Sequence, residues 1–495
     1  MASPNLYWCV TVACWLGSIG CGAAPLRPAP VPATADSRCA RVAAGFAARV
    51  ASGQHVEVSV RWTEPAGDLR VGEAELARRL AQGAPGTEVW VLGRGGSGKS
   101  HLADAVEARL CRQGLILRVD CERDLAPRMA GVPGHGSALA QVLAERLGLD
   151  PSVDPTEGLL AALTGPWTLI LDGTDELTAH ELVLLLRDLR WLGQGEWVQP
   201  NLIRFERPGF DGNEGGPRPR AVVTLPALRC DQADALLARR LPDAGALASA
   251  RAWLAAHRLD RLRVGGEDCS YVHMATWRDA ELIADLAGDA ARGARLPGGP
   301  LSQADLWQAW VGLRWGPIAG SGEAGLAWID RIVAASAHGL ESPGLAFTID
   351  RCMAAAPLEA AAPTEACAAL LASPLVAAAR KSGTWSFRHR TLVDVALARW
   401  LVTRHTDCRS LATAVAGHAS LELMAMVVAQ PAGRRCLDRV VQGACEQGLT
   451  AAQITGFVDE ALPRHPEMVA ELRHSANHTA PGCAREVMEA LIGAP

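Results

Sequence analysis

The sequence is poor in lysine and tyrosine and contains no closely spaced cysteine pair. Among its 495 residues there are 48 Lys and Arg, but only Lys99 and Lys381 are lysines, and only 2 residues are tyrosines. The 14 cysteines are scattered, with no CxxC pair and no cysteine–histidine set at the spacing of a zinc site. This excludes the common zinc modules. We interpret the cysteines as buried apolar residues or surface thiols in a reducing compartment.

Basic runs interleaved with aromatic residues are lacking as well, and the formal net charge is −5. We therefore expect no broad nucleic-acid-binding surface. No leucine-rich, tetratricopeptide or propeller period is present. A hydrophobic content of 49% with 20% charged residues describes a globular chain. Its length has room for about two to four domains.

One of the two lysines lies in a glycine-rich stretch, residues 93–100 (GRGGSGKS), which fits the P-loop pattern. In such a loop the backbone N–H groups turn toward a triphosphate, the lysine reaches the outer phosphates and the serine hydroxyl coordinates Mg²⁺. An apolar stretch at 87–92 predicts a strand before the loop, and the apolar spacing over 101–112 predicts a helix after it. We therefore expect a nucleotide to be bound by Gly93, Gly95, Gly96, Ser97, Gly98, Lys99, Ser100 and His101.

An acidic stretch follows a second apolar segment that we predict as a strand, residues 167–171. An acid at the carboxyl end of a parallel strand lies where such sheets bind ligands. We expect Asp172 to hold Mg²⁺ together with Ser100, and Asp175 or Glu176 to position or deprotonate an attacking water. The alternative is a helix N-terminus that carries acids because they favour the first turn.

Residues 169–177 (LILDGTDEL) resemble the Walker B motif of NACHT NTPases, which belong to the STAND class of signal-transducing ATPases. Residues 201–209 resemble the fourth strand of this family, in which Arg207 and the following proline match and the two residues before them depart. The resemblance implies that Arg207 is a sensor near the γ-phosphate. Residues 385–401 resemble the winged-helix segment of the family, which implies that His389 contacts the β-phosphate of bound ADP and holds a closed state.

The family pattern is broken before the helix that we predict near residue 279. The family carries an Asn-Pro or Gly-Pro there, with the proline against adenine, whereas this chain has Trp277 and Arg278. The adenine contact therefore cannot be carried over.

Residues 6–24 are apolar and uncharged, which is near the minimum length of a membrane-spanning helix. No Lys or Arg precedes Arg27, whereas several arginines follow, so the positive-inside rule favours an anchor with the ATPase facing the cytoplasm. The alternative is a lipoprotein signal ending at Cys21, because residues 18–21 (SIGC) resemble a lipobox. A secretory signal would begin with a basic segment, which is absent here. A wrongly assigned start codon is the remaining alternative.

These patterns predict an α/β fold, a P-loop NTPase with a parallel sheet, followed by a helical subdomain, a winged helix and an all-helical C-terminal tail. The expected divisions are a hydrophobic segment (1–24), a Pro/Ala-rich linker (25–54), a NACHT-like nucleotide-binding domain (55–230), a helical subdomain (231–300), a winged-helix-like region (301–404) and a C-terminal helical region (405–495).

The resemblance implies a signalling switch that binds ATP, hydrolyses it slowly and is closed by ADP. Its partners would be ATP or ADP with Mg²⁺, further copies of the chain on activation, an unidentified protein trigger and a membrane reached through residues 6–24, in bacterial antiviral defence. Two other classes are open. One is an AAA+-like ATPase that remodels protein or DNA by repeated turnover, and the other is a non-catalytic scaffold stabilised by nucleotide.

Overall fold

The computed structural model describes most of the chain from Ala33 onward. The described residues are 33–52, 57–65, 67–129, 137–177, 179–194, 198–207, 219–257, 259, 261–263, 269–274, 276–319, 322–337, 346–356, 363–373, 375–378, 384–387, 390–418, 420–462, 470, 472–474, 476 and 482–493. The expected anchor or lipoprotein signal (1–24) and His389 lie outside them. Within this part of the chain, no helix has the length and apolar character needed to span a membrane.

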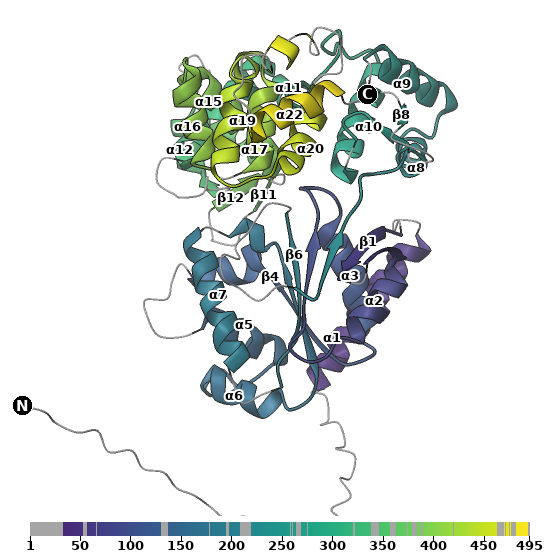
Figure 1. Cartoon of the computed structure of the whole chain (residues 1–495), viewed down its shortest axis with the longest axis vertical. Helices are drawn as coiled ribbons and strands as arrows, with labels where there is room; N and C mark the ends of the chain where they lie inside the picture. The colour runs from purple at the N-terminus through teal and green to yellow at the C-terminus, as the bar shows by residue number, and fades with distance from the viewer. Residues whose placement is uncertain are drawn as a thin grey trace, which may run out of the picture.

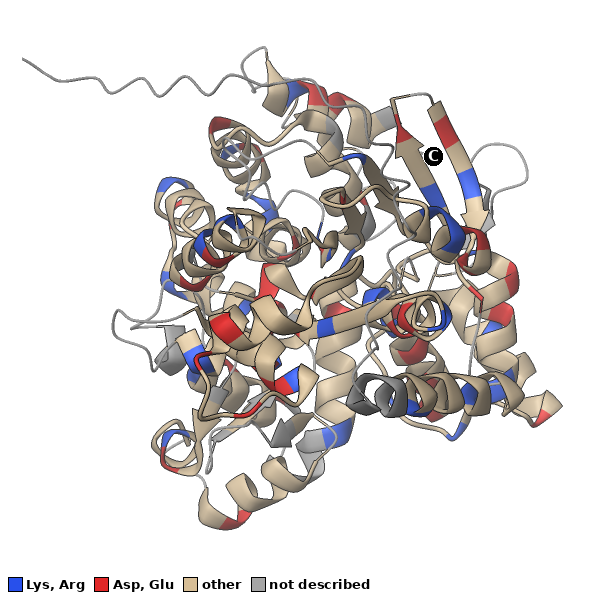
Figure 2. Cartoon of the chain, turned by 90° about the horizontal axis from the view of Figure 1, so that it is seen from below, with Lys and Arg blue, Asp and Glu red and all other residues tan. Residues whose placement is uncertain are grey.

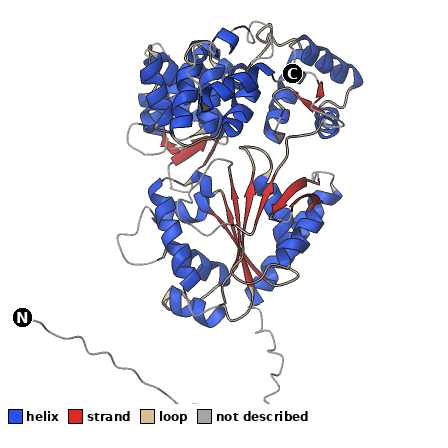
Figure 3. Ribbon diagram, viewed as in Figure 1, coloured by secondary structure: helices blue, strands red, loops and turns tan. Residues whose placement is uncertain are grey.

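A mostly parallel sheet organises the N-terminal half of the described chain (Figures 1 and 3). Its seven strands have the spatial order β2-β1-β7-β3-β6-β5-β4. Strands β7, β3, β6, β5 and β4 run parallel, and β1 and β2 add an antiparallel hairpin at one edge. The strands are β1 (Ser59–Glu64), β2 (Gly67–Gly72), β3 (Glu88–Leu92), β4 (Leu115–Asp120), β5 (Trp167–Asp172), β6 (Asn201–Glu206) and β7 (Ala221–Thr224).

Helices cover both faces of this sheet, as a parallel sheet requires. On one face, side chains such as Val91 and Phe205 pack against Leu102 and Val106, which lie on α3 (Lys99–Leu110). On this side α3 also contacts α1 (Ala33–Ala51) and α2 (Glu73–Ala81). The second core, which includes Leu169, lies beneath α5 (Ala138–Leu147), α6 (Pro155–Ala162) and α7 (Ala179–Gln194). A π-helical turn (Cys121–Leu125) and α4 (Ala126–Met129) follow β4.

Local sequence signals explain where several of these helices begin and end. The Ser137 hydroxyl accepts a hydrogen bond from the Ala140 amide and caps α5, and Gly148 ends that helix in the left-handed region with φ 67°. The carboxylate of Asp154 caps α6, whose first residue is a proline.

The next part of the chain forms a small helical subdomain and a winged helix. The subdomain contains α8 (Cys230–Arg240), α9 (Ala244–Ala256), the short strands β8 (Arg261–Arg263) and β9 (Cys269–Tyr271), and α10 (Trp277–Ala291). After α11 (Gln303–Ala319) the elements follow in the order helix, strand, helix, helix, strand, strand, with an antiparallel sheet ordered β10-β12-β11. They are α12 (Gly322–Ala337), β10 (Ala346–Thr348), α13 (Ile349–Ala354), α14 (Pro363–Ala372), β11 (Val376–Ala378) and β12 (Thr384–Phe387).

The C-terminal helical region packs against this winged helix through α15 (Arg390–Arg404). Its buried central helix is α17 (Leu421–Ala429), which contacts both α15 and α20 (Ala451–Ala461). The other helices described in this region are α16 (Cys408–Ala416), α18 (Pro431–Arg434), α19 (Leu437–Glu446) and α22 (Cys483–Gly493). One continuous core runs from α8 to α22, so the region is part of the fold and not a separate appendage.

The expected linker over residues 25–54 is wrong where it overlaps α1. Residues Ala33–Ala51 form a helix whose Cys39 is disulfide-bonded to Cys111 at the end of α3, and whose Arg49 pairs with Asp104 at 3.0 Å. The segment is rich in Ala and Arg, which are strong helix formers, and the prolines that suggested a linker precede it.

The expectation of free thiols is also wrong for most of the described cysteines. Disulfides join Cys39–Cys111, Cys352–Cys367, Cys408–Cys436 and Cys445–Cys483, and Cys230 is disulfide-bonded too. Cys121, which is buried, is the free thiol among the cysteines that the structure describes. The paired positions are 15 to 72 residues apart in sequence, so tertiary folding and not local spacing brings them together.

Candidate nucleotide-binding site

The glycine-rich loop connects the end of β3 to the first residue of α3, as its sequence predicts. Gly96 and Gly98 have φ values of 77° and 95°, a region that favours glycine. The Lys99 ammonium donates hydrogen bonds to the carbonyl oxygens of Gly93 at 2.7 Å and Arg94 at 3.1 Å. Burial lowers the pKa of Lys99. The loop leads directly into the N-terminus of α3, an arrangement that attracts phosphate.

The other loop positions lie close by. The Gly93 amide donates a hydrogen bond to the carbonyl of Glu206 at 3.0 Å, which ties the start of the loop to the end of β6. Ser97 is buried, and His101 is half-buried in the first turn of α3. A methyl group on Gly95 would lie 3.6 Å from the Arg207 guanidinium and 3.8 Å from Thr391, the second residue of α15. The loop therefore lies close to Thr391, which is far from it in the sequence.

The structure brings the expected magnesium residues together. Asp172 ends β5, and its Oδ1 accepts a hydrogen bond from the Ser100 hydroxyl at 3.3 Å. Asp120, at the end of the neighbouring strand β4, is in register with Asp172. Hydroxyl and carboxylate oxygens at the carboxyl edge of the sheet are the donor set that Mg²⁺ prefers. The residues present therefore fit this cation.

Arg118, which the sequence analysis did not single out, lies at the same carboxylate. Its Nη2 donates to Oδ2 of Asp172 at 2.6 Å and to the Ser100 carbonyl at 3.3 Å. The signal was present in the sequence as one arginine inside the apolar strand LILRVD. Burial disfavours the charged guanidinium, but the charges of Asp172 and Asp104 outweigh that effect and raise the pKa of Arg118.

The two acids after Gly173 have different surroundings. The side chain of Asp175 is 3% exposed and its Oδ2 lies 2.8 Å from Nε of Arg207, so the arginine neutralises it. Glu176 is exposed as a residue, and partial burial of its carboxylate together with the charges of Asp175 and Glu122 raises its pKa. A general base is most effective when its pKa lies near the operating pH, because it is then partly deprotonated and still basic. Of the two acids, Glu176 is therefore better suited to activate a water.

Arg207 occupies the position between the loop and these acids, because β6 lies between β3 and β5. Besides Asp175, its guanidinium meets Glu422 of α17, with 3.4 Å between Nη1 and Oε1. The side chains of Arg207 and Glu422 are 13% and 15% exposed, so this pair is largely shielded from solvent. The sequence predicted Arg207 near the phosphates but gave no indication of Glu422.

The C-terminal helical region also contacts the glycine-rich loop. The Arg94 guanidinium donates to the carbonyl of Gly456 at 2.7 Å and lies 4.2 Å from the ring centroid of Phe457. Both partners belong to α20, which Figure 1 draws above the end of the sheet. Together with the Arg207–Glu422 pair, these contacts place the C-terminal helical region over the phosphate loop.

The start of α10 packs against the other side of the loop. The Arg278 amide donates to the Gly96 carbonyl at 3.4 Å, and a methyl group on Gly96 would meet Cβ of Arg278 at 2.6 Å. A methyl group on Gly98 would lie 3.3 Å from the Trp277 ring. Gly96 and Gly98 are thus required for close packing as well as for their backbone conformation.

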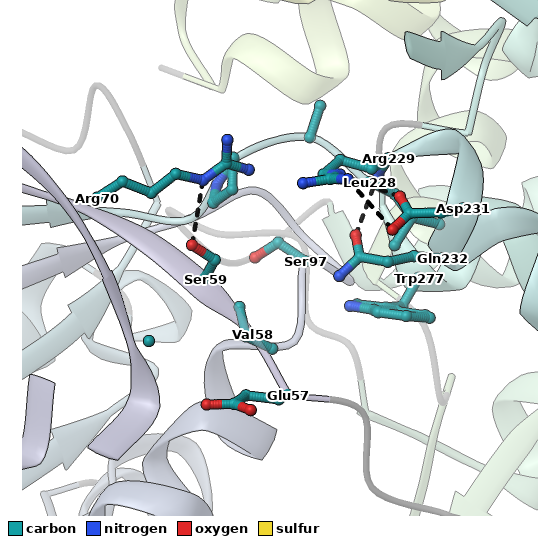
Figure 4. A pocket seen from close by; sticks show the side chains of 13 residues that line it. Glu57, Val58, Ser59, Arg70, Ser97, Leu228, Arg229, Asp231, Gln232 and Trp277 are labelled. Carbon is teal, nitrogen blue, oxygen red and sulfur yellow. Dashed lines mark hydrogen bonds and ion pairs between the residues drawn. The ribbon is translucent and has the colours of Figure 1, made fainter. Parts of the chain in front are cut away.

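A cavity of about 260 Å³ opens beside Ser97 and Trp277 (Figure 4). Its other walls come from the β1–β2 hairpin, including Ser59 and Arg70, and from the start of α8, including Asp231 and Gln232. A flat indole surrounded by hydrogen-bonding groups fits a heteroaromatic base. Because the cavity adjoins the loop, one ligand can occupy both.

Charged residues of both signs are interspersed over the described elements (Figure 2). No family model matches the chain, and no curated protein matches it. Among solved structures it is similar to Cdc6p from Pyrobaculum aerophilum, at 14% identity with a TM-score of 0.31, covering 65% of this chain and 89% of that one. It is also similar to the Drosophila ORC bound to DNA, at 14% identity with a TM-score of 0.28, covering 72% of this chain and 99% of that one.

These similarities are too distant to assign a function. The strand, glycine-rich loop and helix, set in a parallel sheet with an acid at the end of β5, give the chain the fold of a P-loop NTPase. His389 lies outside the described residues, and its contact with ADP stays a prediction.

Proposed function

We propose that this chain is an ATP-binding switch that hydrolyses slowly and holds its nucleotide beneath the C-terminal helical region. The observation that carries the proposal is that Arg207, beside the phosphate loop, is shared between Asp175 and Glu422. A γ-phosphate would compete with Glu422 for this guanidinium, whereas ADP has no γ-phosphate. ATP and ADP would thus differ in affinity for the closed and open states, which is what a nucleotide switch requires.

In this proposal the loop amides and Lys99 bind the phosphates, and the cavity beside Trp277 takes the base. Ser100 and Asp172 would hold Mg²⁺, which supplies charge neutralisation of the phosphates when bound. Glu176 orients and deprotonates the attacking water. The roles of His389 in ADP binding, of self-association, of a protein trigger and of bacterial defence rest on the family resemblance of the sequence.

The direct test is mass analysis of the nucleotide that co-purifies with the wild-type protein and with Lys99→Ala. We expect ADP in the wild type and none in the variant, because removal of the ammonium weakens phosphate binding. Tight ADP binding by Lys99→Ala would refute the assignment of the loop.

Turnover separates the switch from its two alternatives. A switch hydrolyses ATP slowly, and Glu176→Gln should trap ATP without loss of ADP affinity. Rapid repeated turnover would instead indicate an AAA+-like remodelling ATPase. A scaffold in which the nucleotide is only structural would show the same nucleotide content in the wild type and in Glu176→Gln.

We further propose that the domains fold in an oxidising compartment, outside the cytoplasm. The disulfides among the described cysteines support this, because protein disulfides are rare in reducing compartments. The location favours attachment through Cys21 over an anchor in residues 6–24 with the ATPase facing the cytoplasm. A site that keeps one nucleotide for a long time also suits a compartment poor in ATP, whereas repeated turnover does not.

Alkylation of intact cells followed by mass spectrometry tests the compartment. The paired cysteines should escape the alkylating reagent until a reductant is added. Labelling of Cys408, Cys436, Cys445 and Cys483 before reduction would contradict the proposal.

A further inference from the structure

Arg118 neutralises the carboxylate that ends β5, from the strand next to it. Both oxygens of Asp172 are engaged, Oδ1 by the Ser100 hydroxyl at 3.3 Å and Oδ2 by Nη2 of Arg118 at 2.6 Å. The Arg118 side chain is 16% exposed and that of Asp172 is 7% exposed. Solvent therefore screens this pair weakly, and the positive charge acts on the carboxylate at close range.

The surroundings hold the guanidinium in place. Nη1 of Arg118 contacts Asp104 and lies 3.7 Å from Oε2 of Glu107, and both acids are on α3. Asp104 also pairs with Arg49 of α1 at 3.0 Å. Because two acids of α3 fix Arg118 from the other side, its position does not depend on Asp172 alone.

A divalent cation at Ser100 and Asp172 would face this guanidinium. An arginine that is hydrogen-bonded to a carboxylate occupies one of its oxygens, and its positive charge repels a further cation at the same carboxylate. Since Mg²⁺ carries two charges, this repulsion is larger for Mg²⁺ than for a singly charged ion. The carboxylate keeps its place but loses part of its attraction for the metal.

We infer that Arg118 is a positioning residue that orients Asp172 and weakens Mg²⁺ binding, so that the chain binds nucleotide with little dependence on Mg²⁺. The inference rests on the proposed nucleotide site. It goes beyond that proposal because it assigns the metal dependence of binding to one residue of the fold. It also agrees with a resting state in which the nucleotide is held and not hydrolysed.

The test measures the affinity for a fluorescent ADP analogue in EDTA and at increasing Mg²⁺ concentrations, for the wild type and Arg118→Gln. The glutamine keeps a donor for Asp172 but removes the charge. We expect the Mg²⁺ concentration at half-effect to fall about tenfold in Arg118→Gln, and Arg118→Lys, which keeps the charge, to stay near the wild type. An unchanged or higher Mg²⁺ requirement in Arg118→Gln overturns the inference.

Arg128→Gln is the matched control, because Arg128 pairs with Glu145 at 2.6 Å and contacts neither Asp104 nor Asp172. It should leave the Mg²⁺ dependence unchanged. If Arg118→Gln does not fold, Asp104→Asn provides the second test. Loss of a competing acid strengthens the hold of Arg118 on Asp172, so the Mg²⁺ requirement should rise, and no rise overturns the inference. Absence of ADP binding in the wild type would refute the proposed function instead.

Discussion

Arg207 at the end of the central strand β6 and Glu422 in the first turn of α17 form an ion pair, with 3.4 Å between Nη1 and Oε1. The arginine lies beside the phosphate loop and the glutamate lies in the C-terminal helical region. A charge added near Arg207 therefore acts directly on the contact between the two halves of the molecule. This relationship is the physical basis of the proposed switch.

Glu422→Gln should favour the open state. The substitution removes the negative charge that competes with a γ-phosphate, and coupling energies of this kind change affinities by about 5- to 150-fold. We expect faster release of a fluorescent ADP analogue and easier self-association with ATP, measured by stopped flow and sedimentation. Glu446→Gln, an exposed acid of the same region, is the control. Equal release rates for both variants would show that the pair does not control the state.

Trp277→Ala should weaken nucleotide binding by removing the stacking contact with the base, while the contacts with the phosphates stay intact. Stacking of a base on an aromatic ring contributes about 1–3 kcal/mol, so ADP affinity should fall about tenfold, and Trp277→Phe should recover most of it. Calorimetry with inorganic pyrophosphate, which has no base, provides the comparison. If pyrophosphate affinity falls as much as ADP affinity, the ring supports the loop and does not contact the base.

The stability of the chain should decrease as the pH rises through 7. Burial raises the pKa of Glu206 to about 7, against the opposing effects of Arg204 and Thr174. Because the folded-state pKa exceeds the unfolded value, the proton-bound form stabilises the fold below about pH 4.5, and this contribution of about 3 kcal/mol is lost as the pH rises through 7.

Urea unfolding at several pH values tests this dependence. Asp330, whose pKa burial raises to about 6, contributes with the same sign and keeps part of the slope in any Glu206 variant. Glu206→Gln should therefore flatten the pH profile without abolishing it. Identical pH slopes for the wild type and Glu206→Gln would contradict the assignment to this carboxyl group.

Removal of the Cys445–Cys483 disulfide should destabilise the C-terminal helical region. The bond joins α19 to α22 across a sequence separation of 38 residues, which corresponds to about 4 kcal/mol in the loop-entropy model. The double variant Cys445→Ser, Cys483→Ser should melt at a lower temperature, and a reductant should lower the melting temperature of the wild type as well. Cys121→Ala, at the buried free thiol, should leave the response to reductant unchanged.

Much of the nucleotide-binding fold could be predicted because its signals are local. The apolar runs that became β3, β4, β5, β6 and β7 are short, end at turns or acids and lie beside the motif residues. The contact between Ser100 and Asp172 follows from the geometry of parallel strands, whose carboxyl ends meet at one edge.

The remaining features depend on contacts between distant segments. Nothing near Glu422 or Phe457 in the sequence indicates the phosphate loop, because α17 and α20 reach it only after the C-terminal core has formed. The disulfides Cys39–Cys111, Cys408–Cys436 and Cys445–Cys483 likewise join positions that are 28 to 72 residues apart in the sequence. Arg118 was visible as a charge in an apolar strand, but its partner could be identified only once the order of the strands was known.

The bond between Cys39 and Cys111 ties the P-loop helix covalently to α1. It fastens α1 to the carboxyl end of α3, and the opposite end of α3 begins with Lys99. A helix of this length is a stiff rod of about 18 Å. A pull on the chain ahead of Cys39 would therefore be carried through a covalent link and along α3 to the loop that we propose binds the phosphates. Tension on the N-terminal side would then change the affinity for nucleotide.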